Sequence, residues 1–303
     1  LDAVGRYIHD VSYRASVAAI DAAPQGSWQN RMMIDGYDFE IELVAQLSIG
    51  AGEINVDFTG SSGCSRFGIN VPLNYATAYS VFGLRCIFAP EVPNNAGSLA
   101  PFKVHAPSGC IVNAARPVPV AQRHIIGQLL PDVVLGCLRQ AMPKQIPAEG
   151  SSCMYDLPMR GGFDASSRGQ ATPFAVELTH NGGTGARPGK DGLSATAFPS
   201  GVYGSQVEVT ESTCPLLVHR RELRPDSGGA GRFRGGLGQI IEIESREHQP
   251  FDYFGTVDRV KYPARGCFGA RDGLPGKITL GSGERLQGKG KQVISAGESL
   301  LFE

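Results

Sequence analysis

The sequence has little of the features that mark several common classes of protein. It contains no apolar run near the ~20 residues of a membrane-spanning helix, and its first residues lack the order of a signal peptide. It also has no excess of charge, because 28 basic residues stand against 29 acidic ones, for a net charge of −1. We therefore expect no nucleic-acid or membrane partner.

Metal-binding patterns are missing as well. The seven cysteines are odd in number and widely spaced, with no CxxC pair, and lie among apolar or small residues. This pattern favours reduced, mostly buried thiols and a cytoplasmic location. The six histidines show no HxH, HxxxH or HExxH spacing. We expect this chain to bind no metal or other cofactor by itself.

What the sequence does have is glycine and proline. Its 303 residues are enough for one large domain or two ordinary ones, and 40 glycines with 20 prolines accompany a globular apolar content of 42%. This composition indicates many turns, and many turns favour many strands.

Helical periodicity is concentrated in the first half. The spacing predicts helices over Val4–Ala19 and Leu73–Phe88, and a third over His124–Met142 that Pro131 kinks or splits into two. Alternating residues predict a β-hairpin from Tyr37–Ser48 and Ile54–Phe58.

The second half is dominated by strand patterns separated by glycine-rich turns. We predict strands at Cys153–Arg160, Pro173–Leu178, Gln206–Thr210, Leu216–Leu223, Gln239–Glu244, Phe251–Val257, Lys277–Leu280 and Ser299–Phe302. The fold class is therefore α+β, with antiparallel β structure in the second half. We expect residues 1–150 to hold the hairpin and the core helices, and residues 151–303 to be rich in β structure. Together they are expected to form one compact unit of a larger protein.

Two glycine-rich loops, His180–Gly192 and Glu222–Gly238, carry the most unusual chemistry. Both fail the nucleotide motifs, since Thr184 and Asp191 break a P-loop and Pro188 and Arg234 break GxGxxG. Serial turns between strands are one interpretation. A tight, positively edged loop beside an anion is the other.

Other candidate residues each have a structural alternative. Asn70 and Asn95 are either ligand-facing amides or a helix cap and a turn residue. His180 directly precedes the first glycine loop, where a structural hydrogen bond is equally compatible with the sequence. Glu208, Glu211 and Glu222 on neighbouring strands, with Asp226, form either a carboxylate site or salt bridges to Arg220, Arg221 and Arg224.

Six motifs in order resemble the hydantoinase B and oxoprolinase family. They are DFTGSS at 57, IN at 69, PNNAG at 93, ARPVPV at 115, GGTGARPGKDG at 182 and ELRPDSGGAGRFRGGLG at 222. That family includes B subunits of ATP-dependent N-methylhydantoinases, the second half of 5-oxoprolinase, and related subunits of acetone and acetophenone carboxylases. The chain resembles the middle and later regions of the family protein, without the His and Asp metal ligands of its N-terminal half.

The resemblance implies an ATP-dependent enzyme that works in two steps. An A-type ATPase subunit phosphorylates the carbonyl oxygen of a small cyclic amide, and the B-type subunit completes ring opening, with ATP and a divalent metal in the complete hetero-oligomer. This segment is expected to be inactive alone, and its catalytic residues are not identified. A ketone carboxylase subunit and a non-catalytic assembly module are the alternatives.

A substrate pocket in such an enzyme would be lined by residues of the motifs. Arg187, Arg232 and Arg234 suit a carboxylate or phosphorylated oxygen, and free N–H groups of the glycines could add to the anion site. The full candidate set is Asn70, Asn95, His180, Arg187, Asp191, Glu222, Asp226, Arg232 and Arg234.

Overall fold

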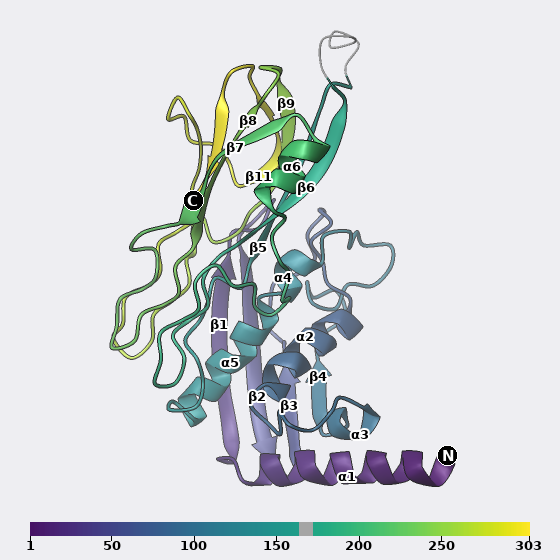
Figure 1. Ribbon diagram of the computed structural model, residues 1–303. Helices are drawn as coiled ribbons and strands as arrows, with labels where there is room; N and C mark the ends of the chain where they lie inside the picture. The colour runs from purple at the N-terminus through teal and green to yellow at the C-terminus, as the bar shows by residue number, and fades with distance from the viewer. Residues whose placement is uncertain (164–171) are drawn as a thin grey trace. The chain divides into compact units, whose positions relative to one another are not determined.

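The computed structural model describes residues 1–163 and 172–303. Within these residues the chain divides into two compact units, Leu1–Pro147 and Ala148–Glu303 (Figure 1). Helices are concentrated in the first unit and antiparallel strands in the second, so the α+β fold class is confirmed. No helix of the described residues is long and apolar enough to cross a membrane.

The first unit is built on a four-stranded sheet in the order β1-β2-β3-β4. The first three strands are antiparallel, which confirms the predicted hairpin, and β4 joins β3 in parallel. The helices α2 and α5 pack on each other, and α5 also packs on β1 and β2. The strands are β1 (Gly26–Ile34), β2 (Ile41–Gly50), β3 (Glu53–Asp57) and β4 (Phe102–His105), and the helices are α1 (Asp2–Asp21), α2 (Leu73–Arg85), α3 (Ala96–Leu99), α4 (His124–Gly127) and α5 (Leu130–Ala141).

The third predicted helix is two helices in the structure. Pro131 stands in the first turn of α5, where its missing N–H would have no partner in any case, and α4 ends at Gly127. Every residue from Leu130 to Leu138 is buried, so α5 is the central helix of the first unit.

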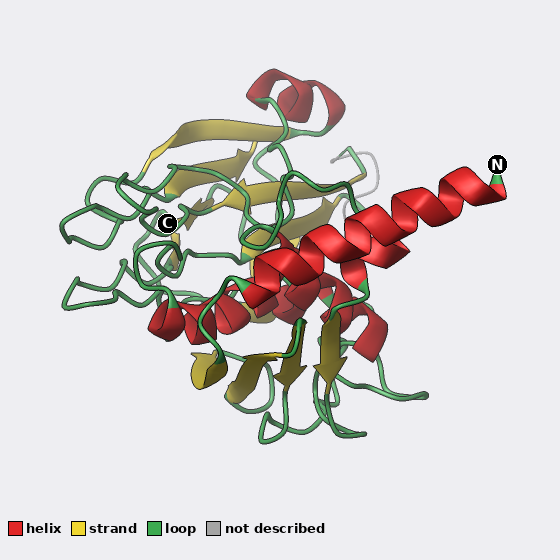
Figure 2. Cartoon of the chain, turned by 90° about the horizontal axis from the view of Figure 1, so that it is seen from below, coloured by secondary structure: helices red, strands yellow, loops and turns green. Residues whose placement is uncertain are grey.

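The first helix is confirmed but only half packed. Its C-terminal half contacts α3, where Ser16 donates a hydrogen bond to the Ser98 carbonyl at 3.0 Å. All of the first eleven residues are exposed, and this half of α1 extends away from the strands of its unit (Figure 2).

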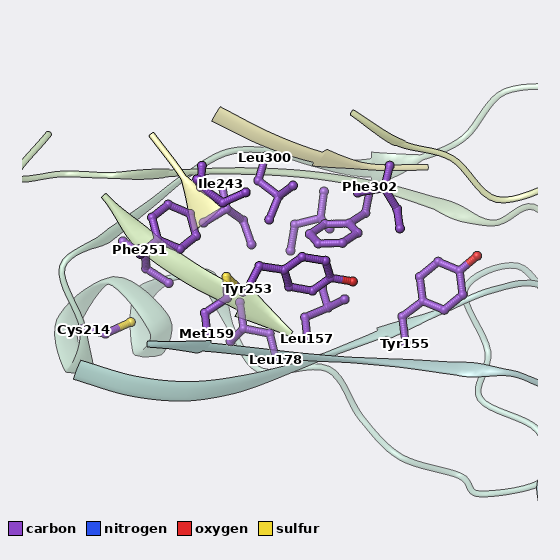
Figure 3. Close-up of a cluster of buried hydrophobic side chains, with 14 of the residues drawn as sticks. Tyr155, Leu157, Met159, Leu178, Cys214, Ile243, Phe251, Tyr253, Leu300 and Phe302 are labelled. Carbon is purple, nitrogen blue, oxygen red and sulfur yellow. The ribbon is translucent and has the colours of Figure 1, made fainter. Parts of the chain in front are cut away.

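The second unit consists of two antiparallel four-stranded sheets. Their orders are β10-β12-β8-β7 and β11-β9-β5-β6. Side chains of both sheets form one core, in which Tyr253 of β9 meets Phe302 of β12 edge-on at 5.1 Å between ring centroids (Figure 3). The strands are β5 (Met154–Gly161), β6 (Phe174–Asn181), β7 (Leu216–Leu223), β8 (Gln239–Ser245), β9 (Phe251–Thr256), β10 (Ile278–Leu280), β11 (Lys289–Ile294) and β12 (Ser299–Phe302).

One predicted strand is wrong. Residues Gln206–Thr210 contribute to α6, a helix from Val207–Thr213. The alternation of valine with polar residues matched a strand, but Thr210 and Cys214, four residues apart, are the positions that become buried. That is the period of a helix face, and Val209 is half exposed.

The cysteines are free thiols with different degrees of burial. Cys110, Cys137 and Cys214 are buried, whereas Cys86 is exposed. Burial raises the pKa of the Cys137 thiol to about 12, so it stays protonated at neutral pH.

Candidate functional site

The two glycine-rich loops lie against each other in the second unit. Residues 182–192 and 228–238, together called the glycine layer below, exchange backbone hydrogen bonds. The N–H of Gly236 donates to the Thr184 carbonyl at 2.9 Å, and that of Gly192 donates to the Arg234 carbonyl at 2.8 Å. Two segments that are far apart in the sequence therefore form one local structure.

Close backbone packing explains why these residues are glycine. A Cβ on Gly236 would overlap the Leu193 carbonyl, one on Gly183 would overlap the Gly236 carbonyl, and one on Gly185 would overlap the Ala148 carbonyl. Neither loop could hold an ordinary side chain at these positions. Several glycine N–H groups are also used inside the layer, so they are not available to an anion.

Asp191 joins the two loops and brings two candidate arginines together. Its Oδ1 accepts the backbone N–H of Arg234 at 2.8 Å, while its carbonyl accepts Nε of Arg187 at 3.0 Å. Among the described residues, the guanidinium groups of Arg187, Arg232 and Arg234 form no ion pair, and Arg232 lies over the Phe233 ring at 5.6 Å. Arg232 and Arg234 are exposed, and Arg187 is half-buried. This arrangement, called the arginine edge below, can offer charge to an anion from solvent.

A buried ion cluster supports the first glycine loop from its other side. Glu149 has a side chain 1% exposed and accepts hydrogen bonds from Arg259 at 2.9 Å and from Arg265 at 2.7 and 2.9 Å. Burial alone would raise the pKa of Glu149, but the two guanidinium groups hold it below its ordinary value. Ala148 and Ser151, on either side, donate their N–H groups to the carbonyls of Ala186 and Gly183. The cluster thus fixes the segment on which the glycine layer rests.

His180 stands at the end of β6, directly before the layer, with 4% of its surface exposed. Its Nε2 donates to the Gln239 carbonyl at 3.1 Å. Burial lowers the pKa of His180 to about 4, so the imidazole is neutral at physiological pH. This places His180 in the structural hydrogen bond that the sequence left open.

The acidic candidates lie apart from Asp191. Glu222, on β7, pairs with Arg220, one of the salt bridges considered from the sequence, and both side chains are exposed. Asp226 is an exposed turn residue with φ of 57°. The expectation that Glu208 and Glu211 lie on a strand beside Glu222 is wrong, because both belong to α6.

Asn70 and Asn95 belong to the first unit, and both carboxamides are fully engaged. Asn70 is 0% exposed; it accepts the Ser65 N–H at 2.7 Å and donates to the carbonyls of Ser65, Phe67 and Pro119. The helix-cap interpretation of Asn70 is wrong, because α2 begins after Pro72 and has no side-chain cap. Asn95 is a cap instead, at the start of α3, with hydrogen bonds to the N–H groups of Gly97 and Ser98.

Several residues of this region carried no signal in the sequence. Glu149, Arg259 and Arg265 lie outside every recognisable motif, and only their convergence in space identifies them. In the portion of the chain that the structure describes, no group of three or more His, Cys, Asp or Glu side chains is arranged to hold a metal ion.

Comparison with known proteins agrees with the fold and with these motifs. The hydantoinase B/oxoprolinase family matches residues 1–303, so this chain belongs to that family. It is 28% identical to 5-oxoprolinase 1 of Arabidopsis thaliana over 99% of its length, and 27% identical to caprolactamase subunit beta of Pseudomonas jessenii over 88%. It spans only 23% and 47% of those two proteins.

The fold is shared with a solved enzyme. The crystal structure of the ATP-dependent caprolactamase from Pseudomonas jessenii superimposes with a TM-score of 0.82 and 24% identity. The match covers 97% of this chain and 53% of the caprolactamase chain. Belonging to this family and sharing this fold, the chain is related to subunits and segments of ATP-dependent cyclic amide hydrolases.

Proposed function

We propose that the chain belongs to an ATP-dependent amidohydrolase that opens a small cyclic amide. In this proposal an A-type ATPase partner phosphorylates the carbonyl oxygen, and this chain helps to receive the activated ring. Its relatives include proteins named 5-oxoprolinase and caprolactamase, whose substrates are cyclic amides by name. ATP and any divalent metal would be held by other regions of the complete cytoplasmic hetero-oligomer.

The arginine edge is the observation that carries this role. A phosphorylated oxygen bears negative charge, and Arg187 and Arg234 are held around a single residue, Asp191, by hydrogen bonds of 3.0 and 2.8 Å. The layer beneath them is fixed by backbone contacts that exclude side chains. A pre-ordered cationic edge loses little side-chain entropy when an anion binds, so its charge acts efficiently.

Phosphorylation also gives a physical reason for two components. An amide is a poor electrophile, and a phosphoryl group on its oxygen carries charge that would otherwise develop there during attack. Cations at the receiving site would stabilise that group as it leaves. The arginines would therefore bind and orient the activated ring, while attack by water uses groups outside this chain.

Reconstitution tests the proposal directly. The complete B-type protein and its ATPase partner should open a cyclic amide such as 5-oxoproline or hydantoin, with ADP released in step and with no requirement for bicarbonate. Strict dependence on bicarbonate would show a carboxylase of the same family instead. Binding of the ATPase without any turnover or substrate binding would show an assembly module.

A further inference from the structure

Asn181, the last residue of β6, has an incompletely satisfied side chain at the start of the glycine layer. The residue is only 5% exposed, and its Nδ2 donates to the Val202 carbonyl at 3.1 Å. Its Oδ1 is buried and accepts no hydrogen bond from any described residue. Buried acceptors are nearly always paired, because leaving one unpaired is costly. This oxygen is therefore a candidate ligand contact.

A thin segment covers this carboxamide. Residues 200–206, called the cover segment below, have no regular secondary structure, and Tyr203 within it is 94% exposed. The segment is attached through the Asn181–Val202 hydrogen bond and through Arg221, which donates to the Ser205 carbonyl. An outward movement of this segment would uncover Asn181 at the loss of few contacts.

Packing beneath the cover segment is incomplete. The hydroxyl of Ser200 is buried and, like Asn181 Oδ1, has no hydrogen-bond partner among the described residues. A cavity of about 10 Å³, the space of one water molecule, lies beside the segment and is lined in part by Thr179 and Ser205. Unpaired polar atoms and a small void at one place show that this cover does not fit its base closely.

The free valences of Asn181 match one chemical group. A carboxamide has an acceptor oxygen and two N–H donors, and Val202 uses one of those donors. A small cyclic amide is held in the cis form, with its N–H and C=O on the same edge, whereas an open-chain amide is trans. The ring edge can therefore form two parallel hydrogen bonds with a carboxamide. The neighbouring imidazole of His180 is buried, and its Nε2 bonds to a backbone carbonyl and not to a carboxylate, which suits a neutral ligand.

We propose that Asn181 recognises the cyclic amide before activation: its Oδ1 accepts the ring N–H and its Nδ2 donates to the ring carbonyl, once the cover segment has moved outward. This inference rests on the proposed function, because it takes the substrate to be a cyclic amide. It adds a specificity residue that no motif indicated. Ring opening destroys the cis-amide edge, so the product would lose this contact.

The test uses two small ligands that differ in the one group at issue. The chain is labelled with ¹⁵N, and the side-chain NH₂ signals of Asn181 are assigned by their loss in Asn181→Leu, or in the shape-conserving Asn181→Asp if the first variant does not fold. Adding 2-pyrrolidone should shift these signals with a dissociation constant of about millimolar, as expected for so small a ligand. N-methyl-2-pyrrolidone, which lacks the N–H, should not shift them.

Two other carboxamides serve as controls within the same spectrum. Asn70 and Asn95 use both their oxygen and their nitrogen in hydrogen bonds, so their signals should stay in place. No shift of Asn181 with 2-pyrrolidone, or an equal shift with the N-methyl compound, would overturn the inference. Either result leaves the proposed function standing if the complete enzyme still couples ATP hydrolysis to ring opening.

Discussion

The Asp191 carboxylate accepts the backbone N–H of Arg234 at 2.8 Å, and this contact joins two loops whose sequences are 43 residues apart. The Asp191 carbonyl meanwhile holds the Arg187 side chain. One residue thus sets the position of two cations, and the arginine edge depends on it.

Removing this carboxylate should loosen the edge. We expect Asp191→Ala to lower the free energy of unfolding by about 1 kcal/mol, because one exposed, charge-assisted hydrogen bond is lost. Asp191→Asn retains an acceptor oxygen and should lose less than half as much. Urea denaturation of both variants measures the difference, and equal losses would show that the Oδ1 contact is unimportant.

The glycine layer predicts a contrast between two neighbouring glycines. A Cβ on Gly236 would overlap the Leu193 carbonyl, so Gly236→Ala should destabilise the chain by about 3 kcal/mol or more. On Gly238 the nearest atom is the Ser227 hydroxyl at 3.7 Å, an ordinary contact. Gly238→Ala should therefore change stability by less than about 1 kcal/mol. Comparable denaturation midpoints for the two variants would contradict the close packing.

Burial of neutral His180 predicts a specific dependence of stability on pH. Because burial lowers its pKa from 6.5 to about 4, the unfolded chain takes up a proton in this range before the folded chain does. Stability should be complete above pH 6.5 and fall as the pH drops to 4, by about 3 kcal/mol from this residue.

Variants of two histidines isolate that contribution. His180→Gln, which keeps a donor toward Gln239, should flatten the curve between pH 6.5 and 4. His9→Gln, on the exposed half of α1, should leave its slope unchanged. A slope that is the same in His180→Gln as in the parent chain would contradict the assignment.

The buried ion cluster predicts a large effect from a small change. Glu149→Gln removes the charge that Arg259 and Arg265 both bind in a site that is 1% exposed. We expect a loss of about 3 to 5 kcal/mol in the free energy of unfolding. The matched control is Glu222→Gln, an exposed pair with Arg220, which should cost less than about 1 kcal/mol.

The sequence predicted those elements of the fold that depend on local periodicity. The helix α1, the hairpin of β2 and β3, and most strands of the second unit follow from apolar spacing. It gave no indication of β11, because Lys289–Ile294 buries only Ile294 and so shows no alternation of apolar residues. The helix α6 was missed because a seven-residue segment fits either period.

The site was harder to predict because its contacts are between distant segments. The glycine content of both loops pointed to unusual backbone packing, and their composition identified Arg187, Asp191 and Arg234. Nothing in the sequence showed that Asp191 would bind Arg234, or that Glu149 would meet Arg259, 110 residues away. Such pairs depend on tertiary folding and leave no trace in local spacing.

The most direct test of the account is turnover by the complete two-component enzyme with altered arginines. Ring opening and ADP release are measured for Arg187→Ala and Arg232→Ala beside the parent, with Lys190→Ala as an exposed cationic control from the same loop. The account predicts a loss of turnover of about tenfold or more for the two arginine variants, with unchanged stability and a near-normal control. Full turnover in both arginine variants, or loss of folding in place of loss of turnover, would contradict it.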